Sequence, residues 1–542
     1  MRLNDYLDKG ASLGIDEPCL TMAENTLSYG QVQALSFTIA RALRRSGVAV
    51  GEKVAILSAN DPIAFSCVFG ITRAGAVWCP INPRNEAAEN RDLLAAFDCT
   101  CLIYQSGFAA LVDQILPDLP QLTTVVCLDE ERPGCQSFDQ WVDGLGYEAG
   151  SADARSADAR SDEAGADEAG ADEAWEGEAW EAAAADDLAM IVGTGGTTGR
   201  PKGVMLTGRN LETMTALTLM GYPFRGRPTY LALAPLTHAA GVLCFPVLAS
   251  GGEVIIMPKP DVGDFLRLIE KHRVTHTFLP PTLIYLLLGH PALDTTNLTS
   301  LQCFWYGAAP MSATRLEEAI TRIGPVMAQL FGQTEAPMMI SMLPPAEHFD
   351  ADGGIALDRL GSAGRPAPLV TVAIMDGDGR LLAHGERGEI VVRGSLVMAG
   401  YYRDPAATAQ ASRFGWHHTG DIGYLDDDNY LFIVDRLKDM IITGGFNVYS
   451  AEVEQAILQH PDVQDCGVIG LPDDKWGERV TAVVQLRPGH SLSSADLATF
   501  VKARLGSVKA PKQVEIWSDL PRSKVGKVLK GEIKNQLVLS AG

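Results

Sequence analysis

Hydrophobic residues recur along this chain with two spacings, and their alternation predicts an α/β protein. From Tyr29 to Arg45, apolar side chains return every three to four positions, as on one face of a helix. Short apolar runs rich in β-branched residues, such as 53–58 and 124–128, alternate with stretches of this kind. Such runs are typical of buried strands that helices join into a parallel sheet.

The alternation continues in the second half of the chain and predicts a further large α/β region. Residues 253–257 and 275–279 have the pattern of strands, and residues 262–272 between them have that of a helix. From Thr371 the apolar runs become shorter and are separated by glycine and aspartate turns, as at residues 376–379. We therefore expect a β-rich subdomain after the two parallel-sheet α/β subdomains.

A compact pattern of strands and helices runs from Arg436 to the C-terminus. Residues 451–460 have the pattern of a helix and residues 480–486 that of a strand. A stretch of about 100 residues is long enough to fold as a separate domain. We expect a large N-terminal domain over residues 1–435 and a small α+β domain over residues 436–542.

Residues 151–187 interrupt this pattern with a short-period acidic repeat. They hold 13 Asp or Glu and 2 Arg, which is a net charge of −11 out of −23 for the whole chain. Like charges repel, and the segment has too little apolar surface to offset the entropy cost of ordering. We expect a disordered insert in a surface loop that tolerates insertion. The alternative is that the segment is an acidic tether that binds a partner.

Composition and charge exclude several classes of protein. A chain of 542 residues with 46% hydrophobic content is too long to fold around one ordinary core, so we expect two or more domains. Its acidic charge, without a Lys/Arg cluster, argues against nucleic-acid binding. Ten cysteines without a C-x-x-C pair predict reduced thiols rather than a zinc site or disulfide framework. With no secretory core and no apolar run near the roughly 18 residues of a membrane span, we expect a cytoplasmic protein without a transmembrane segment.

The densest chemical pattern is a glycine- and threonine-rich segment that ends in a lysine. Glycines let backbone N–H groups face an anion, threonine hydroxyls add donors, and Lys202 adds a compact positive charge. It is not a Walker A loop, because Pro201 precedes the lysine and Gly203 follows it. We predict a phosphate-binding loop formed by Thr194, Gly195, Gly196, Thr197, Thr198, Gly199 and Lys202.

The segment from Thr194 to Val204 resembles the signature loop of the adenylate-forming superfamily. That superfamily comprises acyl- and aryl-CoA synthetases, luciferases and the adenylation domains of peptide synthetases. Its usual loop has serine where this chain has Gly195, so one hydroxyl is missing here. The resemblance covers nearly the whole chain apart from the insert. It implies ATP, Mg²⁺ and coenzyme A as ligands, and a C-terminal domain that is mobile.

Two further motifs follow in the order of that superfamily, at residues 306–310 and 331–335. By the resemblance, both flank adenine, Thr334 contacts the α-phosphate and Glu335 holds Mg²⁺. A carboxylate beside a triphosphate needs a cation between them, which agrees with a metal at Glu335. The other nucleotide-binding residues implied here are Gly307, Ala308, Ala309, Pro310, Phe331, Gly332 and Gln333.

Residues 417–423 resemble the ribose motif, in which the Asp421 carboxylate accepts hydrogen bonds from both ribose hydroxyls. The segment 434–447 resembles the hinge between the two domains. Its Arg436 is implied to bind phosphate or ribose oxygens, and Lys438 to lie at the pivot.

Paired glycines in the hinge region imply a site for coenzyme A. By the resemblance, Gly444 and Gly445 form a loop that the pantetheine arm approaches closely. Without the preceding Arg436 and Lys438, the same pair would be interpreted as a hairpin turn. Near the C-terminus, residues 521–530 resemble the last motif of the superfamily, which implies that Lys527 reaches the substrate carboxylate and the α-phosphate.

The run at residues 234–241 coincides with the acyl pocket of the superfamily. A lone histidine in an apolar run is usually a core residue, but the motif order favours a pocket role for His238. The run has no aspartate to pair with an α-ammonium group, which argues against an amino-acid substrate. We expect an apolar pocket, and its implied members are His238, Gly241, Trp305 and Met338.

Six motifs in this order predict a carboxylate–CoA ligase, that is, an AMP-forming acyl-CoA synthetase. Its partners would be a fatty or related carboxylic acid and coenzyme A, and a homodimer is ordinary for such enzymes. One alternative is an acyl-AMP ligase that loads a carrier protein, although the hinge segment has no long insertion. The other alternative is an inactive nucleotide-binding scaffold, against which the intact Lys202, Glu335 and Lys527 count.

Overall fold

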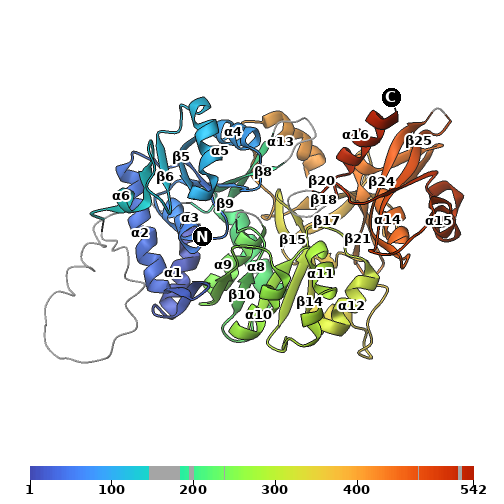
Figure 1. Ribbon diagram of the computed structural model, residues 1–542, viewed down its shortest axis with the longest axis horizontal. Helices are drawn as coiled ribbons and strands as arrows, with labels where there is room; N and C mark the ends of the chain where they lie inside the picture. Colours follow the sequence, from blue (N-terminus) through green and yellow to red (C-terminus); the bar gives the residue numbers. More distant parts are fainter. Residues whose placement is uncertain (146–183, 195–200, 237–238, 474, 523–527, 542) are drawn as a thin grey trace.

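The computed structural model describes residues 1–145, 184–194, 201–236, 239–473, 475–522 and 528–541. Within these ranges, four β-sheets and the helices around them form an α/β protein with a β-rich part and an α+β C-terminal part (Figure 1). The predicted fold class is therefore confirmed. The predicted disorder of the acidic insert concerns residues that lie almost wholly outside the described ranges.

The first α/β subdomain is built on an eight-stranded sheet. Its central pairs are parallel, as expected, whereas β8 and β9 form an antiparallel hairpin. In sheet order the strands are β19 (Gly400–Tyr401), β9 (Lys202–Thr207), β8 (Leu188–Thr194), β4 (Val77–Ile81), β3 (Lys53–Leu57), β5 (Cys99–Tyr104), β6 (Thr124–Cys127) and β7 (Gln136–Ser137).

The second α/β subdomain is built on a nine-stranded sheet. Its N-terminal strands come from far away in the sequence, because β1 pairs in parallel with β11. In sheet order the strands are β16 (Arg365–Pro366), β15 (Ala336–Leu343), β14 (Met327–Gln333), β13 (Cys303–Gly307), β12 (His276–Leu279), β10 (Thr229–Ala232), β11 (Glu253–Ile256), β1 (Pro18–Met22) and β2 (Asn25–Ser28).

Helices cover both large sheets, and local signals fix the ends of several. The Ser28 hydroxyl accepts from the Gln31 N–H and the Gln31 side chain accepts from the Ser28 N–H, so α2 begins at Tyr29. Helices α2 and α10 have the bounds predicted from the sequence. The helices of this region are α1 (Leu3–Leu13), α2 (Tyr29–Arg45), α3 (Pro62–Arg73), α4 (Ala87–Ala96), α5 (Ala109–Ile115), α6 (Phe138–Val142), α8 (Gly208–Gly221), α9 (Ala239–Ala249), α10 (Val262–His272), α11 (Pro281–Leu288) and α12 (Ala313–Ile323).

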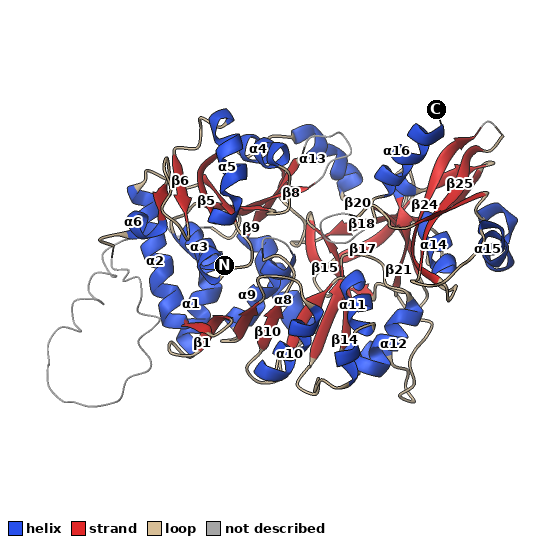
Figure 2. Ribbon diagram, in the orientation of Figure 1, coloured by secondary structure: helices blue, strands red, loops and turns tan. Residues whose placement is uncertain are grey.

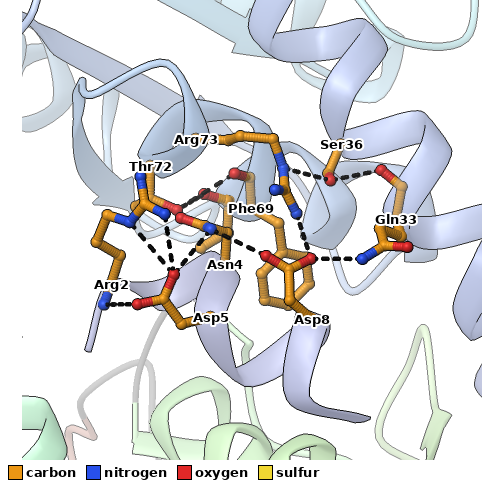
Figure 3. Close-up of polar contacts among 10 residues, drawn as sticks. Arg2, Asn4, Asp5, Asp8, Gln33, Ser36, Phe69, Thr72 and Arg73 are labelled. Carbon is orange, nitrogen blue, oxygen red and sulfur yellow. Dashed lines mark hydrogen bonds and ion pairs between the residues drawn. The ribbon is translucent and has the colours of Figure 1, made fainter. Parts of the chain in front are cut away.

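A buried arginine ties the first three helices together. Figure 3 shows Arg73, at the end of α3, between Asp8 of α1 and Ser36 of α2. Its guanidinium donates to the Asp8 carboxylate at 2.6 Å and to the Ser36 hydroxyl at 3.0 Å, and it lies 3.7 Å from the ring centre of Phe37. Because Arg73 is 6% exposed, these partners compensate a charge that would otherwise be costly to bury.

The β-rich and C-terminal parts follow along the chain, and Figure 2 shows their strands on the side away from α1 and α2. The β-rich sheet contains β17 (Thr371–Met375), β18 (Gly388–Arg393), β20 (His417–Leu425) and β21 (Leu431–Arg436), with α13 (Pro405–Ala411) beside it. The C-terminal sheet contains β23 (Phe446–Val448), β22 (Ile441–Thr443), β25 (Gly477–Leu486), β24 (Val463–Asp473) and β26 (Gln513–Trp517), with helices α14 (Ser450–Leu458), α15 (Ser494–Lys509) and α16 (Lys530–Ala541). None of the helices in the described ranges is long and apolar enough to cross a bilayer.

Candidate active site

The described ends of the predicted phosphate loop are the last residue of β8 and the first residue of β9. Thr194 and Lys202 are paired residues of the β8–β9 hairpin, and the Thr194 hydroxyl donates to the Lys202 carbonyl at 3.4 Å. The pairing fixes where the loop leaves the sheet and where it returns. Gly195, Gly196, Thr197, Thr198 and Gly199 lie outside the described residues, so their placement is not addressed.

The two motifs predicted to flank adenine lie side by side at the ends of neighbouring parallel strands. Gly307 ends β13 and is paired with Leu330 of β14, one residue before Phe331. A Cβ on Gly307 would collide with the Leu330 carbonyl, and a Cβ on Gly332 would collide with the backbone of Met338. Both glycines are therefore required by close backbone packing. In open α/β sheets, ligands bind at this carboxyl edge of the strands.

A turn between β14 and β15 carries Thr334 and Glu335. The Met398 N–H donates to the Glu335 carbonyl at 2.8 Å, and the Tyr401 hydroxyl donates to the Glu335 carboxylate at 2.9 Å. The ring of Tyr401 has Lys202 Nζ 4.9 Å from its centre. Burial and the adjacent Glu335 carboxylate raise the pKa of Tyr401, so its hydroxyl remains a donor. The structure thus brings together Lys202 and Glu335, which are predicted to bind phosphate and metal.

The predicted ribose-binding residues form an ion pair. Asp421 and Arg436 are opposite each other on β20 and β21, and Arg436 Nε lies 2.7 Å from Asp421 Oδ1. The Asp421 side chain is 5% exposed, whereas that of Arg436 is 43% exposed. An acceptor-only carboxylate at this depth can accept ribose hydroxyls, and the arginine can reach outward to a phosphate.

Two residues without a role from the sequence hold the bulge in β20 that precedes Asp421. The Glu389 carboxylate accepts from the Gly420 N–H at 3.0 Å, and its other oxygen lies 2.7 Å from His418 Nδ1. Gly420 has φ +71°, a conformation that favours glycine. Since Glu389 is distant from this motif in the sequence, no local pattern indicated the contact.

The neighbouring His417 is buried in this sheet. Its side chain is 5% exposed, and neither ring nitrogen has a hydrogen-bond partner among the described residues. Burial lowers the pKa of His417 to about 4. The imidazole is therefore neutral at physiological pH and acts as an apolar core side chain.

The predicted hinge residues lie at the surface between the β-rich and C-terminal sheets. Lys438 is exposed in a single 3-10 turn, Leu437–Asp439, directly after β21. The segment that follows is tied to the β-rich sheet where the Asp435 carboxylate accepts from both the backbone N–H and the hydroxyl of Ser450. Both residues are buried, so this contact fixes where α14 begins relative to β21.

The paired glycines form an exposed hairpin turn between β22 and β23. Gly444 has φ +58° and Gly445 has φ +81°, which only glycine adopts readily in succession. A side chain on Gly444 would meet Trp476 at 3.0 Å, whereas Gly445 faces open space. The turn geometry alone accounts for both glycines, and their contact with coenzyme A stays a prediction.

The predicted acyl-pocket residues are only partly brought together. Trp305 is fully buried, with its ring 5.3 Å from that of His276 and 6.0 Å from those of Tyr222 and Tyr230. A Cβ on Gly241 would collide with the carbonyl of Leu236, so backbone packing explains this glycine. Met338 is part-buried beside the main core and has φ +62°, at the irregular β14–β15 pairing.

Two of the predicted site residues belong to segments that the structure does not describe. His238 and Lys527 both lie outside the described residues. Their roles stay as the sequence predicts them.

The donor set near Lys202 suits a magnesium ion carried by a nucleotide. Among the described residues, no group of three or more His, Cys, Asp or Glu could hold a metal ion by itself. Mg²⁺ is commonly held by one or two carboxylates together with substrate phosphates. Glu335 supplies such a carboxylate near Lys202 of the β8–β9 hairpin, so the residues present fit this ion.

Comparisons with known proteins agree with this geometry. Residues 7–402 match the family described as AMP-binding enzyme, and residues 452–527 match the AMP-binding enzyme C-terminal domain. The medium/long-chain-fatty-acid–CoA ligase FadD8 of Mycobacterium tuberculosis is 42% identical over 364 residues, which are 66% of this chain and 62% of that protein. A feruloyl-CoA synthase from Amycolatopsis is 35% identical over 94% of each chain.

Among solved structures, the amide bond synthetase McbA from Marinactinospora thermotolerans has a TM-score of 0.84. It is 29% identical and covers 99% of each chain. The family match over most of the chain and the relatives that span nearly its whole length show that this protein belongs to the AMP-binding enzyme family.

Proposed function

We propose that this chain is an ATP-dependent carboxylate–CoA ligase that activates an apolar acid through an acyl-adenylate. One observation carries the proposal. Tyr401 contacts both Lys202 and Glu335, beside the predicted adenine motifs at the carboxyl edge of β13 and β14. A lysine and a carboxylate held in this way suit a metal–polyphosphate ligand better than an apolar one.

In the first half-reaction, the substrate carboxylate oxygen attacks the α-phosphorus of ATP. A new P–O bond forms while the bond to the leaving pyrophosphate breaks, and the product is a mixed acyl–phosphate anhydride. Lys202, the threonine loop and Lys527 stabilise charge on the phosphoryl oxygens, and Asp421 holds the ribose. Glu335 would hold Mg²⁺, which would supply positive charge against the phosphate oxygens. Positioning and electrostatics therefore carry most of the catalysis.

In the second half-reaction, the sulfur of coenzyme A attacks the acyl carbon. A C–S bond forms, the C–O bond to AMP breaks, and the thiol proton passes to the solvent. Lys527 must leave before a thiol can enter the same space. We propose that the C-terminal domain, residues 436–542, rotates about Lys438 and brings the turn of Gly444 and Gly445 to the reacting centre.

We propose a medium- or long-chain fatty acid as the substrate class. FadD8, named for such acids, supports this assignment, whereas the feruloyl-CoA synthase supports an aryl acid instead. Trp305 with its aromatic neighbours supplies an apolar environment that suits either class. The test below decides between them.

Three other outcomes are open to test. McbA, an amide bond synthetase, suggests an amine as the acceptor. A carrier-protein thiol is a second acceptor, and an inactive scaffold would have no acceptor at all. Deletion of residues 151–185 distinguishes an inactive scaffold from a ligase. A scaffold that acts through the acidic insert loses its partner, whereas a ligase keeps its turnover.

Pyrophosphate release from purified protein tests the proposal. The assay contains Mg·ATP and a panel of fatty, aryl, alicyclic and amino acids, each with and without coenzyme A. Sustained release that requires both an apolar acid and coenzyme A supports the ligase and identifies the acid. Release sustained by an amine or a carrier protein instead contradicts the assignment of the acceptor. Absence of release together with absence of ATP binding contradicts the proposal as a whole.

A further inference from the structure

We propose that Tyr401 is a positioning residue for the metal–nucleotide complex, which rests on the proposed function. Its hydroxyl orients the Glu335 carboxylate, and its ring supports the phosphate-loop Lys202. No role for this tyrosine follows from the sequence motifs.

The backbone places Tyr401 between the two α/β subdomains. It lies in the short strand β19, which pairs with β9 so that Tyr401 is opposite Val204, two residues from Lys202. Just before it, the Met398 N–H donates to the Glu335 carbonyl at 2.8 Å, and just after it, the Tyr402 N–H donates to the Gly203 carbonyl at 2.7 Å. The segment is thus fixed by main-chain bonds to both Glu335 and the phosphate hairpin.

The side chain of Tyr401 also contacts both Glu335 and Lys202. Its hydroxyl donates to Glu335 Oε1 at 2.9 Å, and Lys202 Nζ lies 4.9 Å from the centre of its ring. A hydrogen bond to one carboxylate oxygen fixes the plane of the group and leaves the other oxygen to face a cation. A lysine over a ring is held by the negative face of the π system. One residue therefore sets the distance between the anionic and cationic parts of the site.

Partners of this kind have measurable effects on metal sites. Hydrogen-bond donors to a ligating carboxylate orient it, and their loss costs roughly 10–100-fold in metal affinity or activity. We therefore expect the contribution of Tyr401 to depend on the metal.

The next residue is a matched control. The Tyr402 hydroxyl donates to the Asp98 carboxylate at 3.0 Å, and Lys53 Nζ lies 5.2 Å from its ring centre. Tyr402 therefore makes the same two kinds of contact with a different lysine and a different carboxylate. Tyr401→Phe and Tyr402→Phe each remove one phenol–carboxylate hydrogen bond from the same segment, and only the first concerns Glu335.

Calorimetric titration with α,β-methylene-ATP, whose α,β-phosphate link resists cleavage, tests the inference without any acid or coenzyme A. Each variant is titrated first in EDTA and then at a series of Mg²⁺ concentrations. For Tyr401→Phe we expect wild-type affinity in EDTA, because the ring under Lys202 remains, and a roughly 10-fold smaller gain in affinity from Mg²⁺. Tyr402→Phe should match the wild type in both conditions. Tyr401→Leu, which lacks the ring, should also bind about 2–5-fold more weakly in EDTA.

An unaltered gain from Mg²⁺ in Tyr401→Phe, or an equal loss in Tyr402→Phe, overturns the inference. If Tyr401→Phe does not fold, 3-fluorotyrosine placed at position 401 alone reports on the otherwise native protein. Its fluorine resonance should shift when Mg²⁺ joins the bound analogue, and a resonance that does not move contradicts the proposal. A wild-type protein that binds no analogue contradicts the proposed function and this inference together, whereas the outcomes above concern Tyr401 alone.

Discussion

Arg436 Nε lies 2.7 Å from Asp421 Oδ1 across the paired strands β20 and β21. The carboxylate is nearly buried and the guanidinium is half-exposed, so the pair presents one acceptor group inside and one cation outside. The Glu389 carboxylate accepts from the Gly420 N–H and so fixes the bulge of β20 next to this aspartate. The arrangement presents a carboxylate in a fixed place before any nucleotide binds.

Asp421→Asn tests this arrangement. The amide lacks the charge that strengthens hydrogen bonds from ribose hydroxyls, and a bond to a charged group is worth about 1.5–3 kcal/mol. We expect the KM for ATP to rise by about 10-fold or more, with a smaller change in the KM for the acid. Asp378→Asn, an exposed carboxylate in the turn that follows β17, is the control. An unchanged KM for ATP would contradict the ribose assignment.

Lys527→Ala tests the division of labour between the two half-reactions. We expect the lysine to act at the α-phosphate and to have no part in thiol attack. Adenylate formation, measured as acid-dependent pyrophosphate release, should be abolished. Thioester formation from supplied acyl-AMP should be largely retained. Equal loss of both would show that Lys527 does not act in adenylation alone.

Asp8→Ala tests the buried cluster around Arg73. The substitution leaves the guanidinium, which is 6% exposed, without its carboxylate partner. Loss of one partner of a buried pair costs about 3–5 kcal/mol, and we expect about 2 kcal/mol here because Asp8 is 31% exposed. Urea denaturation measures the change. Asp92→Ala breaks the exposed Arg91 pair instead and should cost less than about 1 kcal/mol.

His417→Leu tests the acid sensitivity of the β-rich sheet. Burial lowers the folded-state pKa of His417 to about 4, below its ordinary value of 6.5. Between these values the unfolded chain binds a proton that the folded chain does not, so stability falls as pH falls from about 6.5 to about 4. The shift corresponds to on the order of 3 kcal/mol.

In His417→Leu, we therefore expect a smaller fall of the urea midpoint between pH 6.5 and pH 4. Burial also lowers the pKa values of His276 and His348 to about 4, so part of the fall should remain. Exposed His384→Leu is the matched control. An identical pH profile in His417→Leu and the wild type would contradict the assignment.

Much of the secondary structure could be predicted from the sequence because its causes are local. Helices α2 and α10 have their predicted bounds, since Ser28 and Asp261 cap them within three residues. The helix predicted over 451–460 lies at Ser450–Leu458 instead, because Ser450 is held by Asp435 from another sheet. Local pattern alone gives such an end only to within a few residues.

The motifs likewise indicated the family and most of the candidate site, because phosphate and adenine recognition need characteristic residue types close together in sequence. Two details had no such signal. The Tyr401 hydroxyl is bonded to Glu335, 66 positions away, and Glu389 supports Gly420, 31 positions away. Neither tyrosine nor glutamate is unusual enough at its place in the sequence to predict its partner.

The sequence by itself determined the alternation of helices and strands, the phosphate-loop chemistry and the order of the motifs, since these depend on contacts within a few residues. Only the tertiary structure decided that β1 joins the second sheet beside β11, and that β19 connects Lys202 to Glu335. It also decided that Gly307 and Gly332 are glycines because other backbones lie against them. The physical reason is that pairing between distant segments depends on how all the elements pack together, which no local pattern records.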